Sequence, residues 1–210
     1  MNDTNRKAHW EIVYTTKREN EVSWFQENPT SSLELIELAN PTPEFAIVDI
    51  GGGTSRLVDS LVARGFGHVT VLDISGAALD AARARLGQRA SQVQWIRADV
   101  TKWSPTQPFD VWHDRAAFHF LIDPADRAAY VARLKQGLKP GGHVVMGTFA
   151  VDGPEKCSGL PVNRYDAASL AKELGTGFVL LDSRRHDHST PWKSAQRFQF
   201  CVFRRAGELT

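Results

Sequence analysis

The sequence is poor in cysteine and in long hydrophobic runs, and it carries no excess of charge of one sign. Two cysteines among 210 residues are too few for the disulfide framework of a small secreted domain. No window approaches the roughly 20 apolar residues that a membrane span needs, and the N-terminal region lacks the apolar core of a signal peptide. The sequence contains 25 Lys and Arg and 24 Asp and Glu. With so small a net charge, no broad electrostatic potential favours binding to nucleic acid or anionic lipid. These absences predict a cytoplasmic protein with no nucleic-acid or membrane partner and a locally recognised small ligand.

The composition that remains is that of an ordinary globular chain. Hydrophobic residues make up 42% and charged residues 23% of the sequence. A chain of this length buries a sufficient core as one compact unit. We therefore expect a single domain over residues 1–210.

The middle of the chain alternates short β-rich runs with longer helical patterns, which is typical of parallel strands joined by crossover helices. Helices are expected near residues 54–64, 76–86 and 124–138. The loop at 101–108 contains two prolines and can replace a full crossover helix. The expected strands span residues 45–50, 68–74, 93–100, 109–114 and 142–149.

The pattern changes on both sides of this core at residues 45–150. Residues 1–40 form an aromatic-bearing segment, with a helix expected near 30–39. After Phe149 a loop leads to a helix with Asp166 as its N-cap. The final part, residues 151–210, ends in two strands that are near enough in sequence to pair antiparallel, at 178–184 and 196–203.

The stretch "IVDIGGGTSRLVD" at residues 47–59 reads as a strand, a glycine turn and the start of a helix. Such a turn can bind a dinucleotide, because backbone N–H groups at a helix N-terminus receive phosphate well. Two residues argue against this ligand. Arg56 occupies the place of the third glycine of the dinucleotide fingerprint, and Asp49 would put a negative charge beside the pyrophosphate. A cationic ligand fits better.

Asp49, Gly51 and Gly53 resemble the first motif of the class I methyltransferases. The resemblance implies S-adenosylmethionine as cofactor, with the acid facing its amino-acid end and the glycines allowing close approach of the backbone. Two further acids, Asp73 and Asp99, support this interpretation, because each lies at the end of a predicted strand. The resemblance implies that Asp73 binds the ribose hydroxyls and that Asp99 binds the adenine amino group. The expected cofactor-binding residues also include their neighbours Ile74 and Val100.

The resemblance implies an α/β, Rossmann-like class I methyltransferase fold. Its sheet is mostly parallel and seven-stranded, with an antiparallel C-terminal strand pair. The stretch "LKPGGHVVMGTF" at residues 138–149 resembles the turn before the family's fifth strand. Aspartates are also common as turn formers and caps, so the register of three acids with the glycines is what favours the family.

The N-terminal segment resembles the lid of two subgroups, the thiopurine S-methyltransferase-like enzymes and small lysine methyltransferases. In the first subgroup, lid aromatics pack on the cofactor, which implies Trp10, Tyr14 and Trp24 here. Aromatic faces favour a nearby sulfonium by cation–π attraction. An ordinary hydrophobic cluster is the alternative interpretation of these rings.

The segment after the fourth strand, "FDVWHDRAAFHFLIDPADRAAY", resembles the corresponding stretch of the S-methyltransferase subgroup but is one residue longer. Its candidate catalytic residues are Asp114, Arg115 and His119, with the cation able to favour a thiolate. We predict no metal site, because the histidines and acids of this segment lack the helical spacing of ligands.

The sequence therefore predicts a methyltransferase that acts on a small-molecule acceptor by in-line transfer, with a thiol or other soft nucleophile favoured. The first alternative is a protein lysine N-methyltransferase, which should show a shallow acidic groove. An NAD-dependent oxidoreductase and a non-catalytic cofactor-binding module are weaker alternatives. The sequence predicts neither which molecule is the acceptor nor an oligomeric state.

Overall fold

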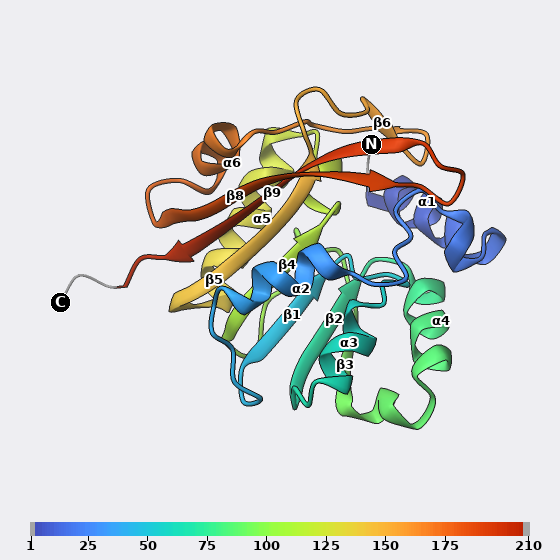
Figure 1. The fold of residues 1–210 in the computed structure, drawn as a ribbon, viewed down its shortest axis with the longest axis horizontal. Helices are drawn as coiled ribbons and strands as arrows, with labels where there is room; N and C mark the ends of the chain where they lie inside the picture. The colour runs from blue at the N-terminus through green and yellow to red at the C-terminus, as the bar shows by residue number, and fades with distance from the viewer. Residues whose placement is uncertain (1–2, 208–210) are drawn as a thin grey trace.

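A computed structural model describes residues 3–207 and places most of the chain around one seven-stranded sheet (Figure 1). The sheet contains β1 (Ala46–Ile50), β2 (His68–Asp73), β3 (Val93–Arg97), β4 (Phe109–Arg115), β5 (Leu138–Phe149), β8 (Phe178–Ser189) and β9 (Ala195–Arg205). A separate two-stranded sheet pairs β6 (Lys156–Cys157) with β7 (Leu160–Pro161).

The strand order is β3-β2-β1-β4-β5-β9-β8. Strands β1 to β5 are parallel, whereas β9 runs antiparallel to both β5 and β8. The chain starts in the middle of the sheet, builds outward to β3 and then returns to β4 on the other side of β1. This reversal puts the ends of β1 and β4 next to each other, where open α/β sheets bind their ligands. The predicted fold class is confirmed.

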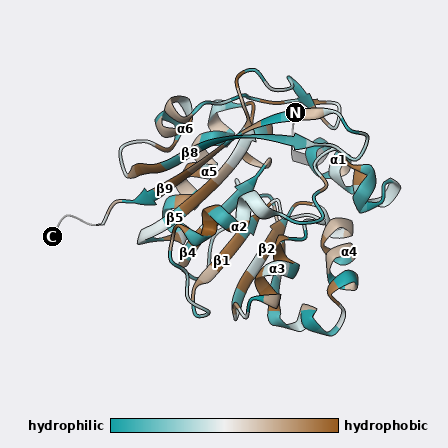
Figure 2. Cartoon of the chain, in the orientation of Figure 1, coloured by the Kyte–Doolittle hydropathy of each residue, from teal (hydrophilic) through white to brown (hydrophobic). Residues whose placement is uncertain are grey.

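Helices cover both faces of the sheet. One face packs against α2 (Thr30–Glu37), α3 (Leu57–Ala63) and α4 (Gly76–Leu86), and the other against α5 (Pro124–Gly137) and α6 (Ala167–Leu174). Figure 2 shows hydrophobic residues along β1, β2 and β5 and a largely hydrophilic α1 (Asp3–Thr16). Strands buried on both faces explain why their sequences read as continuous apolar runs.

Local sequence signals fix several helix ends. Ser75 caps α4 by accepting a hydrogen bond from the backbone N–H of Ala78, and Asp123 caps α5 just before Pro124. Asp166 caps α6, as predicted. Short 3-10 helices complete the chain at η1 (Glu19–Glu21), η2 (Gly87–Gln92) and η3 (Phe118–Phe120).

The structure differs from the sequence prediction at several elements, among them β3, which ends at Arg97, and β5, which begins at Leu138. Helix α1 was not predicted, because its apolar residues do not follow a helical stripe. Helix α3 begins three residues later than expected, since the N–H of Ser55 bonds to the carbonyl of Gly52 and prolongs the glycine turn. Strands β8 and β9 are longer than expected because their antiparallel pairing continues to Ser189 and Ala195. Within residues 3–207, the predicted loop replaces a helix between β3 and β4.

Among the described residues, no helix has the length and apolar character needed to cross a membrane. The first two and last three residues of the predicted domain lie outside the described range.

Candidate functional site

A cavity opens at the carboxyl edge of the parallel strands, beside α1. The empty space within it, open solvent at its mouth included, is about 740 Å³. The ends of β1 to β4 form one side, and α1 with the segment that follows it forms the other. The lining residues are Arg6, Trp10, Tyr14, Trp24, Ile50, Gly51, Leu72, Asp73, Ile74, Ala98, Asp99, Val100, Arg115, Ala116, Ala117, Phe120, Leu121 and Cys157.

The glycine turn after β1 brings the backbone against its neighbours. Gly51 and Gly53 have φ of 64° and 51°, a conformation that L side chains rarely adopt. A Cβ at Gly51 would lie 2.6 Å from the Cβ of Ala117, and one at Gly53 would lie 2.6 Å from the Tyr14 hydroxyl oxygen. Gly51 lines the cavity, whereas Gly53 supports it from behind by leaving room for Tyr14.

Two of the predicted acids lie on the cavity wall with their carboxylates partly satisfied by backbone. Asp73 is 5% exposed and accepts a hydrogen bond from the N–H of Ser75 at 2.8 Å. Burial raises the pKa of Asp73 to about 7. Oδ1 of Asp99 accepts from the N–H and hydroxyl of Thr101, but its Oδ2 is buried without a hydrogen-bond partner among the described residues. Such an atom calls for a donor from a ligand.

Aromatic rings from the N-terminal segment close the other side of the cavity. The ring of Trp10 lies 4.9 Å from Phe120 and 5.7 Å from Trp24, centroid to centroid. Tyr14 packs beside both tryptophans. The predicted lid residues are thus brought together over the carboxyl edge of the sheet, where they form an apolar wall facing the acids.

Polar contacts attach α1 to the sheet at two places. Glu11 accepts hydrogen bonds from the Ser75 hydroxyl and the Gly76 N–H, at the first turn of α4. A carboxylate at a helix N-terminus is favoured by the helix dipole. Arg6 pairs with Asp126 at 2.9 Å and lies 3.9 Å from Oδ2 of Asp99. These contacts explain how a helix with little apolar periodicity remains docked over the cavity.

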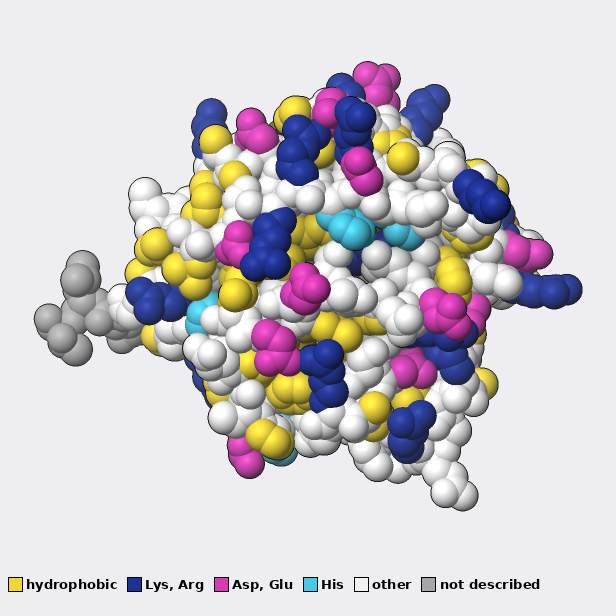
Figure 3. All heavy atoms as spheres, in the orientation of Figure 1, with side chains coloured by type: hydrophobic (Ala, Val, Ile, Leu, Met, Phe, Trp, Pro, Cys, Tyr) yellow, Lys and Arg dark blue, Asp and Glu magenta, His cyan; other side chains and the backbone are white. Residues whose placement is uncertain are grey.

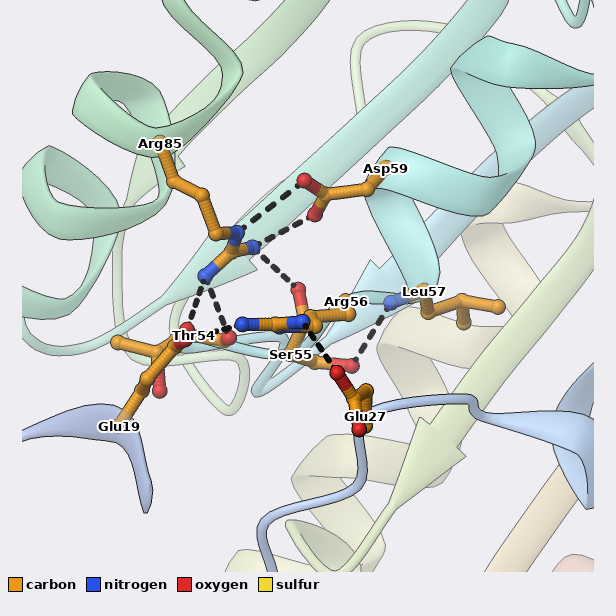
Figure 4. Close-up of polar contacts among 8 residues, drawn as sticks. All are labelled: Glu19, Glu27, Thr54, Ser55, Arg56, Leu57, Asp59 and Arg85. Atoms are coloured by element: carbon orange, nitrogen blue, oxygen red, sulfur yellow. Dashed lines mark hydrogen bonds and ion pairs between the residues drawn. The ribbon is translucent and has the colours of Figure 1, made fainter. Parts of the chain in front are cut away.

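A third attachment is the ionic cluster drawn in Figure 4. Glu19 pairs with Arg56 at 2.6 Å and with Arg85 at 2.9 Å, while Arg85 also pairs with Asp59. The guanidinium of Arg85 additionally donates to the carbonyl oxygens of Thr54 and Ser55. Arg56, which argued against a dinucleotide, therefore joins the lid segment to the end of the glycine turn.

Asp49 lies behind the glycine turn and does not line the cavity. Its Oδ1 is 2.7 Å from Nδ1 of His113, and Nε2 of His113 is 2.8 Å from the Ser32 hydroxyl. Each of these side chains is at most 2% exposed. With Asp49 ionised, Nδ1–H donates to the carboxylate and the Ser32 hydroxyl donates to Nε2. This row of hydrogen bonds was not predicted, because it joins three elements that are separate in the sequence.

Arg115 ends β4 and reaches the cavity from the opposite side to Asp73. Its Nη2 donates to the backbone oxygen of Trp24 at 2.8 Å, and its guanidinium lies 5.4 Å from the Phe198 ring centroid. Burial lowers the pKa of Arg115 to about 10, which keeps it charged at neutral pH. Among the three predicted catalytic residues, Arg115 is the one on the cavity wall.

Asp114 points to the opposite face of the sheet and is fully buried. It accepts hydrogen bonds from the Tyr130 hydroxyl at 2.7 Å and from the N–H groups of Ala117 and Phe118. It thereby holds the turn at Ala116, whose φ is 67°. This placement argues against the predicted catalytic role and assigns Asp114 to positioning the chain around Arg115.

Replacing Asp114 with asparagine should lower the free energy of unfolding by about 1–3 kcal/mol, because the amide group turns a donor toward the Tyr130 hydroxyl or toward two backbone N–H groups. Chemical denaturation measures this cost. Asp187→Asn, at an exposed acid on β8, is the matched control and should change little. Equal stability of both variants would contradict the role assigned to Asp114.

His119 is also buried and does not line the cavity. Its Nδ1 accepts a hydrogen bond from the N–H of Phe149 at 3.3 Å, and its ring packs against Phe120 and Phe149. Burial lowers the pKa of His119 to about 3. A base of this strength removes protons poorly, so the predicted catalytic role of His119 is not supported. Among the described residues, no three potential metal-ligating side chains gather.

The structure thus places most of the predicted cofactor residues on one cavity and adds others. Cys157 was not among the predicted site residues, although it lies on the cavity wall with Arg115. Arg6 was not predicted to line the cavity, because its position depends on the docking of α1. The predicted residues on the wall are Trp10, Tyr14, Trp24, Gly51, Asp73, Ile74, Asp99, Val100 and Arg115, and those away from it are Asp49, Gly53, Asp114 and His119.

Comparison with known sequences gives a family match over the core. The profile of a family described as a methyltransferase domain matches residues 47–142. Trans-aconitate 2-methyltransferase of Rhizobium leguminosarum bv. trifolii (strain WSM2304) is 31% identical over 161 residues, covering 76% of this chain and 50% of the relative. Thiocyanate methyltransferase 1 of Arabidopsis thaliana is 25% identical over 202 residues, covering 93% and 84%. The chain spans about half the length of the trans-aconitate relative.

Comparison with solved structures agrees on the fold. The N-methyltransferase NodS of Bradyrhizobium japonicum WM9, solved in complex with S-adenosyl-L-homocysteine, superposes with a TM-score of 0.70. The match covers 97% of this chain and 99% of that protein at 18% identity. At this identity the likeness concerns the fold.

Proposed function

We propose, from the premise that the chain contains a class I, S-adenosylmethionine-dependent methyltransferase domain, that it methylates a small-molecule acceptor, with a thiol or other soft nucleophile favoured. The observation that carries this proposal is the cavity itself. Its acidic strand ends face an aromatic lid, and a charged arginine stands at one side. This combination suits a cationic nucleoside on the acids and an acceptor near the arginine.

The residues of the cavity fit the cofactor. The Oδ2 of Asp99, which has no hydrogen-bond partner among the described residues, would accept from the adenine amino group, with the Val100 backbone beside it. The carboxylate of Asp73 would hold the ribose hydroxyls. Apolar side chains such as Ile50 and Leu72 line the space between these strand ends. The rings of Trp10 and Tyr14 would lie beside the sulfonium and favour its charge.

When bound, the cofactor supplies a methyl group on a positively charged sulfur. The contribution of the chain is to align the acceptor and to exclude water, and orientation alone can contribute about 7–11 kcal/mol to a well-placed reaction. The aromatic wall of Trp10 and Trp24 keeps water from this side of the cavity. Arg115 faces the same space and stabilises negative charge on an acceptor.

Among the described residues, no side chain that lines the acceptor side is suited to general-base catalysis. Burial raises the pKa of Tyr14 well above 10 and that of Cys157 to about 11, so both stay protonated at neutral pH. A free thiol ionises near pH 8.5 and needs little help to become a nucleophile. Alcohols and ammonium groups need a base. The cavity therefore favours an acceptor that is a ready nucleophile.

One relative supports this preference, whereas others are named for the methylation of trans-aconitate or of oxygen atoms. The name of the Arabidopsis relative gives thiocyanate, a sulfur-containing anion, as its acceptor. We extend this sulfur preference, and the lid resemblance to thiopurine S-methyltransferase-like enzymes, to the present chain. A lysine acceptor would need an acidic groove, whereas the free charge at this acceptor side is the cation of Arg115.

The proposal also covers the domain organisation of the enzyme, its location in the cell and the kind of partner that it binds. We expect residues 1–210 to act as one domain, because β8 and β9 extend the same sheet as β1 to β5. A cytoplasmic setting is consistent with two cysteines that are free and buried. On the face shown in Figure 3, basic and acidic side chains are interspersed, which favours a small acceptor over nucleic acid.

Incubation with methyl-labelled S-adenosylmethionine and a panel of thiols, carboxylates, amines and phenols tests this function. We expect label in a small thiol or another soft nucleophile. Label that enters only protein in a cell lysate would contradict the small-molecule acceptor. Absence of cofactor binding by calorimetry would contradict the function altogether.

Replacing Trp10 with alanine should lower cofactor affinity or turnover by about tenfold, because the ring contributes the lid wall and an attraction to the cation of up to about 2 kcal/mol. Calorimetry and initial rates measure the two effects. Ile12→Ala is the matched control, since Ile12 lies on the same helix with its side chain 61% exposed. Loss of neither affinity nor turnover in the Trp10 variant would leave the ring as simple packing.

A further inference from the structure

We propose that Arg115 is the counter-ion of the acceptor, which binds in the cavity as a small anion with the methyl-accepting atom carrying the negative charge. The inference rests on the proposed function and narrows its substrate class. The shared chemistry is that of a monoanionic nucleophile, whether a sulfur anion or a carboxylate.

The first observation is that Arg115 forms no ion pair with any acid among the described residues. Its Nε is also buried without a hydrogen-bond partner in this part of the chain. Its contacts are the Trp24 backbone oxygen and the face of Phe198. Other arginines of low exposure are paired: Arg85 with Asp59, and Arg127 with Glu173.

The second observation is that the groups around Arg115 compensate its charge only in part. His188 lies under the lid segment with its Nε2 at 2.7 Å from the Ser23 oxygen, and burial lowers its pKa to about 4. His119 and Cys157 are neutral at pH 7 for the same reason. The carboxylate of Asp49 raises the pKa of Arg115 without forming an ion pair with it, and its hydrogen bond is made to His113.

A half-buried guanidinium that forms no ion pair, with its Nε buried, is costly in a folded protein. A charge retained in this way on the wall of a cavity is compensated when an anion binds there. The planar guanidinium offers directed N–H donors, and the unpartnered Nε–H is one of them. Phe198 and Trp24 make the same region apolar, which favours a weakly hydrated anion over a strongly hydrated one.

The charge balance of the reaction agrees with this geometry. The lone pair of the anionic acceptor atom forms the new bond to the methyl carbon. The electron pair of the broken carbon–sulfur bond stays on the donor sulfur, which becomes neutral. Both products of the transfer are therefore neutral at the reacting atoms, and no proton has to be removed. This explains why the acceptor side needs a cation and no base.

The test measures anion binding without turnover. The protein is saturated with S-adenosylhomocysteine, and thiocyanate, thiophenolate and benzoate are titrated by calorimetry at pH 8. The neutral counterparts are acetonitrile, phenol and benzamide. We expect at least one anion to bind about tenfold or more tightly than its neutral counterpart. Tighter binding of the sulfur anions assigns the acceptor to thiolates, and tighter binding of benzoate assigns it to carboxylates.

Variants then assign the effect to Arg115. Arg115→Met should lose about tenfold to a hundredfold in anion affinity, whereas Arg115→Lys should retain part of it. Affinity for S-adenosylhomocysteine should stay within about threefold, which shows that the variants are folded. Arg164→Met is the matched control on the neighbouring loop, where Arg164 pairs with Glu155, and it should bind the anions normally.

Three results would overturn the proposal. The first is equal binding of anions and neutral counterparts by the wild-type protein, a measurement that needs no variant. The second is normal anion affinity in Arg115→Met. The third is methylation of a neutral amine or phenol at a rate that Arg115→Met leaves unchanged. If S-adenosylhomocysteine itself fails to bind the wild-type protein, the proposed function fails and this inference with it.

Discussion

Replacing Asp73 with alanine is expected to weaken binding of S-adenosylmethionine by about a hundredfold. Asp73 ends β2 and faces the cavity, where its carboxylate can accept from two neighbouring hydroxyls of the ribose. Each hydrogen bond to a charged group contributes about 1.5–3 kcal/mol, and each tenfold change in affinity corresponds to about 1.4 kcal/mol. Calorimetric titration measures the loss directly.

A control variant and a stability measurement show whether the loss of affinity comes from the Asp73 carboxylate itself. Asp80→Ala removes an exposed acid from α4 and should leave the affinity unchanged. Thermal unfolding of the Asp73 variant without cofactor should stay close to that of the wild type, because the substitution relieves a buried acid. Unchanged affinity in a folded Asp73→Ala protein would remove the cofactor from this part of the cavity.

The same carboxyl predicts how cofactor affinity depends on pH. Burial, reinforced by nearby Asp49, raises the pKa of Asp73 to about 7, although the N–H groups of Ser75, Gly53 and Ile74 oppose this shift. A cationic ligand favours the ionised form, so binding releases protons and tightens as pH rises from about 6 to 8. Asp73→Asn should abolish this dependence. A flat profile in the wild type would contradict it.

Replacing His113 with leucine is expected to destabilise the protein by about 3–5 kcal/mol. The substitution removes the partner at 2.7 Å from Asp49 and the one at 2.8 Å from Ser32. Breaking a buried pair from one side leaves an uncompensated charge, which accounts for the size of the effect. Chemical denaturation in the absence of cofactor measures the free energy of unfolding.

A double-mutant cycle separates this loss from a packing defect. In an Asp49→Asn background, His113→Leu should cost clearly less, because no buried charge is left behind. His68→Leu, at the exposed start of β2, is the matched control. Equal costs of His113→Leu in both backgrounds would mean that the histidine contributes only its volume.

The fold predicted from the sequence was confirmed for elements that depend on neighbouring residues alone, namely on hydrophobic periodicity and on capping or turn residues. Apolar runs such as the one ending at Ile50 form strands buried on both faces. The N-cap predicted at Asp166 begins α6. Helix α1 was missed for the opposite reason: its stability depends on contacts such as that of Glu11 with the first turn of α4, which are distant in sequence.

The cofactor side of the site was predicted for a geometric reason. Parallel strands end at one edge of a sheet, so acids at the ends of successive strands meet whatever the loops do. Asp73 and Asp99 accordingly lie on the same cavity wall. Their roles toward the cofactor remain predictions that the Asp73 experiment addresses.

The acceptor side was less predictable, because adjacent residues on a strand point to opposite faces. Asp114 and Arg115 were paired as catalytic candidates, yet the first faces the helix layer of Tyr130 and the second faces the cavity. His119 was a candidate by proximity in sequence, and its burial against Phe149 removes it from the cavity wall.

The sequence by itself determined the fold class, the glycine turn and the acidic edge of the sheet, because these follow from short-range patterns repeated at each strand. Only the tertiary structure decided which charges are paired. It joins Asp49 to His113 across two strands, while Arg115 faces the cavity without an ion pair to any acid of residues 3–207. Pairing depends on distances of a few ångströms between elements far apart in the chain, and burial gives those distances their energetic weight.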